Sequence, residues 1–594
     1  MPKVVGASAP GPGGVHHDTK ERWMRRIRVP WTAAECGDGR KAARGWGREP
    51  RVKGSARRRG VLAGALLLGG ALFSVPFHVG SVMGDESPAE IERPSDFGRP
   101  DLPPVMEAEI ATLLQAMEEG GISAREVVEA HLARIAAYDR AGPYLNAITR
   151  LHPEALARAD SLDEHFRRTG ALVGPLHGIP VIIKENYDVM GLATTAGSLA
   201  LEGWAAAEDA FQVQRLREAG AILLAKSNMA EFAFSPQETV GSALPGYTRN
   251  PYDPVRVTAG SSGGTAAAVA ASFGVVGLGT DTGNSIRGPS AHQGLVGIRS
   301  TMGLTSRSGI VPLYLDRDVG GPMARTVEDA VRILEVLAGS DPRDPVTADA
   351  DRQLPPGGYL AHLRSDGLEG ARIGVVRQLS DTDTADPEVL ARFHEALEVL
   401  ARGGATLVDP VEIPELDAIT GPLWCRSFRW DLEAWLAERQ DRVPVASLAE
   451  IVQGGRYHPS VAGRLQSFLS VDGESREENA ECRASDANAR ELRDGISRAM
   501  EMAGLDAVVY PTWSNPPRLI GDLNTPDGNN SFQLSPPSGF PAITVPMGHV
   551  GNGLPVGLQF LGAAWSEPRL IELSYAYEQV TRHRRPPPTT PPLW

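Results

Sequence analysis

Cysteine and lysine are both scarce in this 594-residue chain, and each scarcity is informative. The three cysteines are Cys36, Cys425 and Cys482. They lie far apart without C-x-x-C spacing, which excludes a disulfide-rich scaffold and a cysteine zinc site. Lysine occurs six times, and beyond residue 60 only Lys184 and Lys226 remain. Acidic residues outnumber basic ones, 73 to 59, so we expect no nucleic-acid partner.

Charge is distributed unevenly along the chain. Residues 1–60 contain fifteen basic and five acidic residues, a net charge of +10 against −14 for the whole chain, so the remainder carries −24. This leader is predicted to be disordered, because it is strongly charged and shows no apolar periodicity. The body that follows is acidic, with the composition of a globular protein.

An uncharged apolar run, residues 61–75, follows three arginines, Arg57 to Arg59. Fifteen residues are few for a membrane span and are typical of the apolar part of an export signal. We therefore predict that 57–84 is a signal peptide or membrane anchor. The protein would then be exported, periplasmic or extracellular, or associated with a membrane through this segment. A cytoplasmic location stays the alternative, since no small-x-small cleavage site follows the run.

From about residue 103 the hydrophobic pattern becomes periodic. Apolar residues recur at helical spacing over 106–139, with a break at Gly120 and Gly121. Ser123 and Glu126 then form a capping-box pattern for a second helix. Further helices are expected at 265–279, 385–402 and 485–503, and strands at 178–184, 221–226, 372–376, 507–512, 542–547 and 553–562. This alternation predicts one large α/β domain over 103–585.

The two lysines of the body each end an apolar run that is predicted to be a buried strand. These runs are GIPVIIK, ending at Lys184, and AILLAK, ending at Lys226. A desolvated ammonium group can lose its proton and act as a base, whereas the guanidinium group of arginine stays protonated. The alternative explanation is that these two lysines remain by chance in a chain that uses arginine at nearly every other basic position. Position at a strand end favours a role for lysine in the chemistry.

Two serine-rich and glycine-rich segments lie close together, AGSSGG at 259–264 and TDTGNSIRGPS at 280–290. The first matches G-x-S-x-G, the nucleophile elbow, with Ser262 as the nucleophile. The elbow requires an apolar strand before it, and the preceding segment contains a proline and two charges instead. No downstream histidine stands in a setting that marks it as a base. A serine activated by a lysine is the remaining arrangement.

Six segments together resemble the amidase signature family of Ser-Ser-Lys hydrolases. They are GPLHGIPVIIKENYDV, AKSNMAEF, AGSSGGTAAAVAA, GTDTGNSIRGPSAHQGLVGIRSTMGLTSRSGIVPL, and the pair SGFPAITVPM and GLPVGLQFLG. The resemblance implies a mixed β-sheet covered by helices on both faces. It also implies hydrolysis of a carboxylic amide other than a peptide bond, a small-molecule amide substrate, and no metal or organic cofactor. A homodimer is among the assemblies expected.

The resemblance also assigns roles to individual residues. Ser285 matches the nucleophile, Ser261 the bridging serine that follows a cis peptide bond, and Lys184 the base. The turn before the nucleophile, Thr282, Gly283, Asn284 and Ser285, would supply the backbone N–H groups of the oxyanion hole. The family commonly has Gly-Gly before the nucleophile, whereas this chain has Gly283-Asn284. Asn tolerates left-handed backbone angles, so we expect the turn to be preserved. Its side chain is expected to cap the turn, the alternative being a polar contact near the leaving group.

Other polar residues near these motifs are predicted to be structural. Lys226 resembles a family lysine outside the triad. Asp281 and Arg287 are expected to form a buried support pair, and His292 to be packed rather than a ligand. Three tryptophans at helical spacing, Trp424, Trp430 and Trp435, are expected in the core.

Two other functions fit the same resemblance. One is the A-type subunit of a glutamyl-tRNA amidotransferase, which supplies ammonia to a partner subunit. The other is a catalytically silent binding protein on the same fold. The intact set of Lys184, Ser261 and Ser285 favours an enzyme.

Overall fold

The computed structural model describes residues 103–439 and 442–593. The predicted leader at 1–60 and the predicted signal or anchor at 57–84 lie outside the described residues. Among the helices that are described, none is both long enough and apolar enough to cross a membrane.

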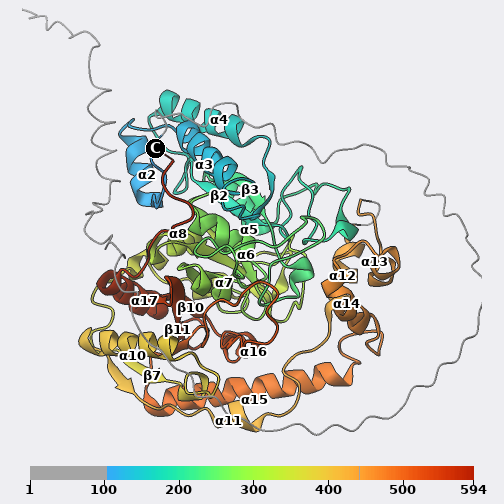
Figure 1. Ribbon diagram of the computed structural model, residues 1–594, viewed down its shortest axis with the longest axis vertical. Coiled ribbons are helices and arrows are strands. Elements are labelled where there is room, and N and C mark those ends of the chain that lie inside the picture. The colour runs from blue at the N-terminus through green and yellow to red at the C-terminus, as the bar shows by residue number, and fades with distance from the viewer. Residues whose placement is uncertain (1–102, 440–441, 594) are drawn as a thin grey trace, which may run out of the picture. The chain divides into compact units, whose positions relative to one another are not determined.

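One mixed sheet of eleven strands organises the described chain (Figure 1). Its order is β1-β3-β2-β4-β6-β5-β10-β11-β9-β7-β8. The strands are β1 Ile148–Leu151, β2 Pro180–Lys184, β3 Ile222–Ser227, β4 Val276–Asp281, β5 Val296–Arg299, β6 Val319–Ala324, β7 Arg372–Val375, β8 Thr406–Val408, β9 Ala507–Pro511, β10 Ala542–Val550 and β11 Leu554–Leu561. Strand β2 runs parallel to both of its neighbours, β3 and β4. The carboxyl ends of these three strands therefore meet at one edge of the sheet.

Both faces of the central sheet are covered. Every residue of β2 to β6, β9 and β11 is buried, and successive residues of a strand point to opposite faces. The helices are α2 Ile110–Glu118, α3 Ala124–Tyr138, α4 Ala155–Thr169, α5 Phe211–Glu218, α6 Gly263–Ala270, α7 Arg287–His292, α8 Val327–Leu337, α9 Ala350–Gln353, α10 Pro387–Arg402, α11 Pro414–Ala418, α12 Phe428–Ala437, α13 Leu448–Gly454, α14 Ala462–Leu469, α15 Ala480–Ala503, α16 Ser535–Ser538 and α17 Glu567–Thr581. The predicted α/β fold with a mixed, helix-covered sheet is confirmed.

The sequence patterns locate most elements correctly. All six predicted strands are present, as β2, β3, β7, β9, β10 and β11. The predicted capping box is formed, with the Ser123 hydroxyl accepting from the backbone of Glu126 and the Glu126 carboxylate accepting from the backbone of Ser123. The helical prediction for 265–279 is wrong in its second half, because α6 ends at Ala270 and β4 begins at Val276. The Ala-rich run and the Val-Gly-Leu-Gly run are both completely buried, so neither shows the alternation that separates a helix from a strand.

A smaller helical group stands beside the sheet. Helices α12, α13 and α14 lie together at the right of Figure 1. They form a hydrophobic cluster with the loops around Phe232 and Phe234, in which Phe234 packs on Phe428 with ring centroids 4.8 Å apart.

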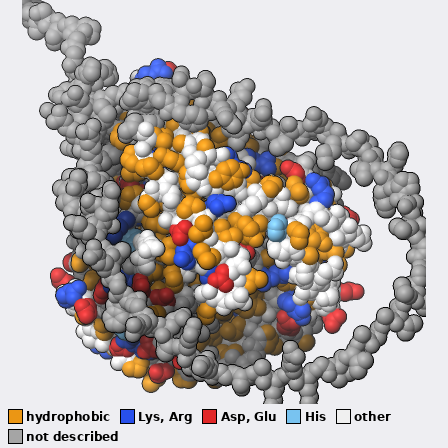
Figure 2. All heavy atoms as spheres, in the orientation of Figure 1, with side chains coloured by type: hydrophobic (Ala, Val, Ile, Leu, Met, Phe, Trp, Pro, Cys, Tyr) orange, Lys and Arg blue, Asp and Glu red, His pale blue; other side chains and the backbone are white. Residues whose placement is uncertain are grey.

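A disulfide bond between Cys425 and Cys482 joins the segment before α12 to the long helix α15. The cysteine spacing had not indicated this bond. Figure 2 shows basic and acidic side chains interspersed on one face.

Candidate active site

The base predicted by the sequence lies at the carboxyl end of β2. The Nζ atom of Lys184 donates to Ser261 Oγ at 2.8 Å and to Thr280 Oγ1 at 2.7 Å. Lys184 is completely buried, and this burial lowers the pKa of its ammonium group to about 7, although Asp281 and Asp318 act in the opposite direction. Near neutral pH a large fraction of Lys184 is therefore unprotonated and able to accept a proton.

The second lysine is held differently. Lys226 Nζ donates to the backbone carbonyls of Tyr187 and Ala193, both at 2.8 Å, and lies 3.5 Å from a carboxylate oxygen of Glu185. Burial lowers the pKa of Lys226 too, but its neighbours are acceptors that stabilise the charged form. No serine contacts its ammonium group among the described residues. Lys226 thus anchors the loop after β2.

Three serines lie near the base, and they have different surroundings. Ser261 contacts Lys184 and follows the cis peptide bond Gly260-Ser261. Ser262 donates to the Thr280 carbonyl at 3.2 Å, so its hydroxyl ties the start of α6 to β4. Ser285 lines a cavity, and within the described chain its hydroxyl makes no hydrogen bond. Of the three hydroxyls, that of Ser285 is the one available to a substrate.

The turn after β4 presents a row of unpaired donors. Across the ranges that the structure describes, the backbone N–H groups of Thr282, Gly283, Asn284 and Ser285 have no hydrogen-bond acceptor. Converging free N–H groups beside a nucleophile can stabilise the negative oxygen of a tetrahedral intermediate. The oxyanion hole assigned here by the family resemblance stays a prediction, and the unpaired N–H groups are compatible with it.

A buried ion pair supports this turn. The Asp281 carboxylate accepts from the backbone N–H of Ile286 at 3.1 Å and from Arg287 Nε at 3.1 Å. Asp281 and Arg287 are both completely buried, and Arg299 also contacts Asp281. Burial favours the neutral acid, but the two guanidinium groups outweigh it and lower the pKa of Asp281. The predicted support pair is present, with Arg299 as a third member.

Asn284 differs from the expectation in two respects. It is absent from the residues with positive φ, so the predicted left-handed conformation is wrong. Its side chain also does not cap its own turn. Instead Nδ2 donates to the carbonyl of Gly260 at 3.2 Å and to that of Pro236 at 3.4 Å. The side chain reaches across to the loop that carries Ser261.

The cavity above the turn has a volume of about 580 Å³. Its walls come from the loop after β3, the segment between β5 and β6, the segment before α12, helix α14 and the loop after β9. Residues lining it include Phe234, Gln237, Thr282, Gly283, Asn284, Ser285, Leu313, Tyr314, Trp424, Arg426, Arg464, Phe468, Asp527 and Phe532. Polar and apolar residues both line it, but most of the surface exposed to the cavity is apolar, which suits an apolar substrate group.

Trp424 stands directly over the turn. A Cβ atom placed on Gly283 would lie 3.0 Å from the Trp424 ring, so glycine allows the ring to approach the turn this closely. On its other side Trp424 stacks with the guanidinium of Arg317, 4.4 Å from the ring centroid. The prediction that all three tryptophans belong to the core is therefore wrong for Trp424. Trp435, only 6% exposed, is in the core.

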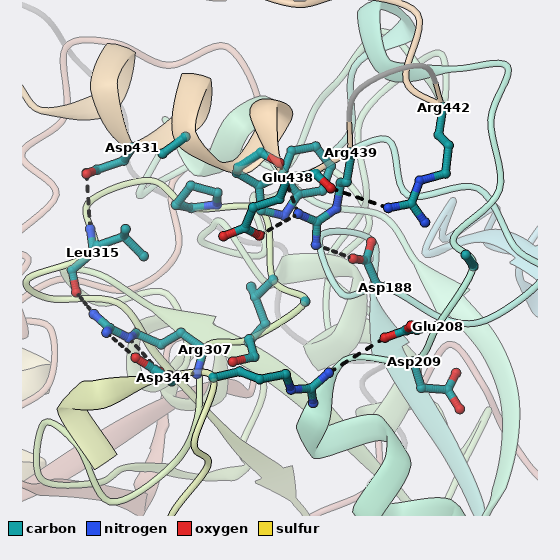
Figure 3. Close-up of a pocket in the computed structure, with 18 of the residues that line it drawn as sticks. Asp188, Glu208, Asp209, Arg307, Leu315, Asp344, Asp431, Glu438, Arg439 and Arg442 are labelled. Atoms are coloured by element: carbon teal, nitrogen blue, oxygen red, sulfur yellow. Dashed lines mark hydrogen bonds and ion pairs between the residues drawn. The ribbon is translucent and has the colours of Figure 1, made fainter. Parts of the chain in front are cut away.

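A second cavity, of about 550 Å³, is shown in Figure 3. Its charged side chains pair with one another: Asp188 with Arg439 at 2.7 Å, and Arg307 with Asp344 at 2.9 Å. None of Lys184, Ser261 and Ser285 lines it. Because none of the three residues assigned to the chemistry lines it, this cavity is not the proposed catalytic one.

Neither a metal site nor a histidine base is indicated near the nucleophile. Within 103–439 and 442–593, no group of three or more His, Cys, Asp or Glu side chains is arranged to hold a metal ion. His292 is buried and stacks on Trp513, with ring centroids 4.6 Å apart. Burial lowers the pKa of its imidazole to about 3, so His292 is a neutral packed residue, as predicted.

Two polar residues of the site were not identified from the sequence. Thr280 places its hydroxyl and carbonyl against Lys184 Nζ, and Asp318 accepts from the Thr282 hydroxyl at 2.6 Å. Thr280 opens the segment TDTGNSIRGPS, five residues before Ser285. Its closeness to Ser285 in the sequence could have marked it as a site residue. Asp318 follows a loop after the motif and carries no local signal.

Comparison with known proteins identifies the family of the chain. The Amidase family profile matches residues 126–571. A probable amidase of Arabidopsis thaliana is 34% identical over 527 residues, which cover 85% of this chain and 95% of the relative. The A-type subunit of the glutamyl-tRNA(Gln) amidotransferase of Acidothermus cellulolyticus is 35% identical, covering 80% of this chain and 94% of the relative.

A solved structure agrees with these matches. The peptide amidase of Stenotrophomonas maltophilia superimposes with a TM-score of 0.71 at 37% identity, covering 82% of this chain and 99% of that protein. Fold and relatives together define an amide-hydrolysing α/β enzyme. The chain belongs to the amidase family.

Proposed function

We propose that this chain hydrolyses linear carboxylic amides through a serine acyl-enzyme, with Ser285 as the nucleophile, Ser261 as the proton relay and Lys184 as the base. The contact between Lys184 Nζ and Ser261 Oγ at 2.8 Å, on a lysine whose pKa is lowered to about 7, is the observation that carries the proposal. A base with a pKa near the working pH is the most effective kind.

The reaction proceeds in two halves. Ser285 Oγ attacks the amide carbonyl carbon, its proton passes to Ser261, and the Ser261 proton passes to Lys184. The carbonyl oxygen becomes negative and accepts hydrogen bonds from the N–H groups of 282–285, each of which contributes about 3 kcal/mol in comparable sites. As the C–N bond breaks, the proton returns through Ser261 to the leaving nitrogen, and ammonia or an amine departs.

Water completes the cycle. It attacks the ester carbonyl of the acyl-enzyme and gives its proton to the Ser261–Lys184 pair. The same pair then returns a proton to Ser285 Oγ as the carboxylic acid leaves. Each proton taken up in one half is released in the same half, so no cofactor is consumed.

The cavity walls support an apolar acyl group in the substrate. Of the three charged side chains that line the cavity, Arg426 pairs with Glu481, Asp527 accepts from Gln237, and Arg464 donates to the Phe234 carbonyl. Phe234, Trp424 and Phe532 supply apolar surface beside the nucleophile. The similarity to a peptide amidase supports the inclusion of C-terminal peptide amides among the candidate substrates.

Labelling with a fluorophosphonate tests the proposed nucleophile. After cleavage of the chain before Asp281, which separates Ser285 from Ser261 and Ser262, we expect adduct mass on the peptide that contains Ser285, and loss of both labelling and amide hydrolysis in Ser285→Ala. An adduct on the peptide that contains Ser261 and Ser262 would refute the assignment. A panel of aliphatic, aryl and peptide amides, assayed with the same preparation, then identifies the acyl group.

An amidotransferase A-type subunit is the second candidate. The similarity to such subunits from several bacteria, at 34% to 35% identity for two of them, favours it. A subunit of this type delivers ammonia to a partner that acts on aminoacyl-tRNA. Isolation of the chain from its native host in complex with partner subunits, and glutaminase activity dependent on them, would support this candidate over a free-standing amidase.

We further propose that the protein is exported, or held at a membrane by its N-terminal segment. The apolar run behind the arginine cluster supports this proposal, and so does the Cys425–Cys482 bond, because disulfides persist in oxidising compartments. Cell fractionation is the test. Recovery of the full-length protein from the cytoplasm alone would contradict export.

A further inference from the structure

Asn284 occupies the position directly before the proposed nucleophile, and its side chain leaves the turn. The amide is buried, with 3% of the residue exposed. Its Nδ2 atom donates to the carbonyl of Gly260, the residue that precedes Ser261, and to the carbonyl of Pro236. One side chain thus connects two segments of the site. They are the turn 282–285, called the nucleophile turn, and the segment 257–262 that carries Ser261, called the relay loop. The same side chain also contacts a wall of the cavity.

The orientation of this amide is determined by its partners. Two carbonyl oxygens face Nδ2, and an exchange of Oδ1 and Nδ2 would place three acceptors together. The Pro236 carbonyl also accepts from the backbone N–H of Gly260 at 2.8 Å. Asn284 therefore completes a small closed network around the peptide unit that leads into Ser261.

Packing restricts the amide as well. A Cβ atom on Gly288 would lie 2.5 Å from Asn284 Nδ2 and 2.9 Å from Trp513 Nε1. Glycine at this position leaves room for the amide, and the backbone N–H of Gly288 donates to the Asn284 carbonyl at 2.6 Å. The side chain is confined between α7 and the relay loop.

We infer that Asn284 is a positioning residue that sets the separation between Ser285 and Ser261. This inference rests on the proposed function. The two hydroxyls are not hydrogen-bonded to each other in the described chain, so proton transfer requires them to draw together, and the serines belong to separate loops. The hydrogen bond from Nδ2 to the Gly260 carbonyl is a direct side-chain link between those loops. Its loss allows the relay loop to move away from the nucleophile.

Asn284→Asp is the sharpest variant, because it keeps the size of the side chain and removes the donor. We expect kcat to fall by about 10- to 100-fold with KM within about twofold, since misplacement of reacting groups by about 1 Å costs a factor of this order. The rate of phosphonate labelling at Ser285 should fall in parallel. Asn284→Ala, which adds no charge, should show the same pattern with a smaller loss.

Asn250 provides a matched control. It is also buried, and its Nδ2 donates to two backbone carbonyls, those of Val257 and His292, at 3.2 and 3.1 Å. It contacts neither catalytic serine. Asn250→Ala should lower the melting temperature at least as much as Asn284→Ala, yet leave kcat within about twofold of wild type. A general loss of stability would instead reduce kcat in both variants.

The outcomes separate the inference from the function on which it rests. If the wild-type protein is not labelled at Ser285, the proposed function fails. If it is labelled, and folded Asn284→Asp and Asn284→Ala react at the wild-type rate, only the role of Asn284 is refuted. A loss that appears in KM rather than kcat also refutes the positioning role, because it would place Asn284 in substrate binding.

Discussion

The two halves of the candidate active site are built in opposite ways. Every residue from 257 to 301, which includes the relay loop, β4 and the nucleophile turn, is buried. The cavity wall over 421–430 and 461–470 alternates between buried and exposed positions. The first half is held by buried hydrogen bonds and the Asp281 ion pairs, the second by aromatic packing and one disulfide. Changes in the buried half should therefore affect the chemistry, and changes in the wall should affect the choice of substrate.

The largest effect is expected at Lys184. Arginine keeps the charge and approximate length but stays protonated, so Lys184→Arg should lose activity by about three orders of magnitude or more. Wild-type activity should rise with pH through about 7, as the lysine loses its proton, and the variant should lack this limb. Steady-state kinetics over a pH series is the measurement.

Lys226→Arg is the matched control. The residue ends the neighbouring strand and is equally buried, but it contacts carbonyl oxygens and Glu185 rather than a serine. Most activity should remain. If Lys184→Arg, shown by circular dichroism to be folded, retains activity within tenfold of wild type, Lys184 is not the base.

The same contrast explains what could be predicted from the sequence. Lys184, Ser261 and Ser285 lie in strand ends and glycine-rich turns, where local patterns are strong. The six predicted strands are present because short apolar runs between turn residues have few other conformations in a buried core. The prediction of a helix over the whole of 265–279 is wrong because complete burial removes the periodicity that distinguishes a helix from a strand.

The remaining site residues depend on tertiary structure. Asp318 reaches Thr282, and Trp424 reaches Gly283, across long sequence separations that no local pattern encodes. Helical spacing suggested the core for Trp424, but its segment precedes α12 and is not helical. The direction of the Asn284 side chain likewise follows from the position of the relay loop.

Trp424→Leu tests the cavity wall and should have an intermediate effect. Loss of the ring over the turn removes apolar contact area, so kcat/KM for amides with bulky apolar acyl groups should fall by about tenfold. Small aliphatic amides should be affected much less. Trp430→Leu serves as control, because Trp430 packs in the same cluster but does not line the cavity. Equal losses for both substrate classes would show that Trp424 acts on the turn rather than on the acyl group.

The smallest effect is expected from the disulfide. Cys425 adjoins Trp424, and its partner Cys482 is buried on α15, so the bond holds the wall against a helix that carries no catalytic residue. Cys482→Ser should raise KM for bulky amides by a few-fold, leave kcat nearly unchanged, and lower stability by about 2 to 4 kcal/mol. Cys36→Ser, at the one cysteine outside the bond, should match wild type. Thiol titration of the unreduced, denatured full-length protein should find one free cysteine, Cys36. Three free thiols would mean that the wall is held by packing alone, and reduction should then change neither KM nor the melting temperature.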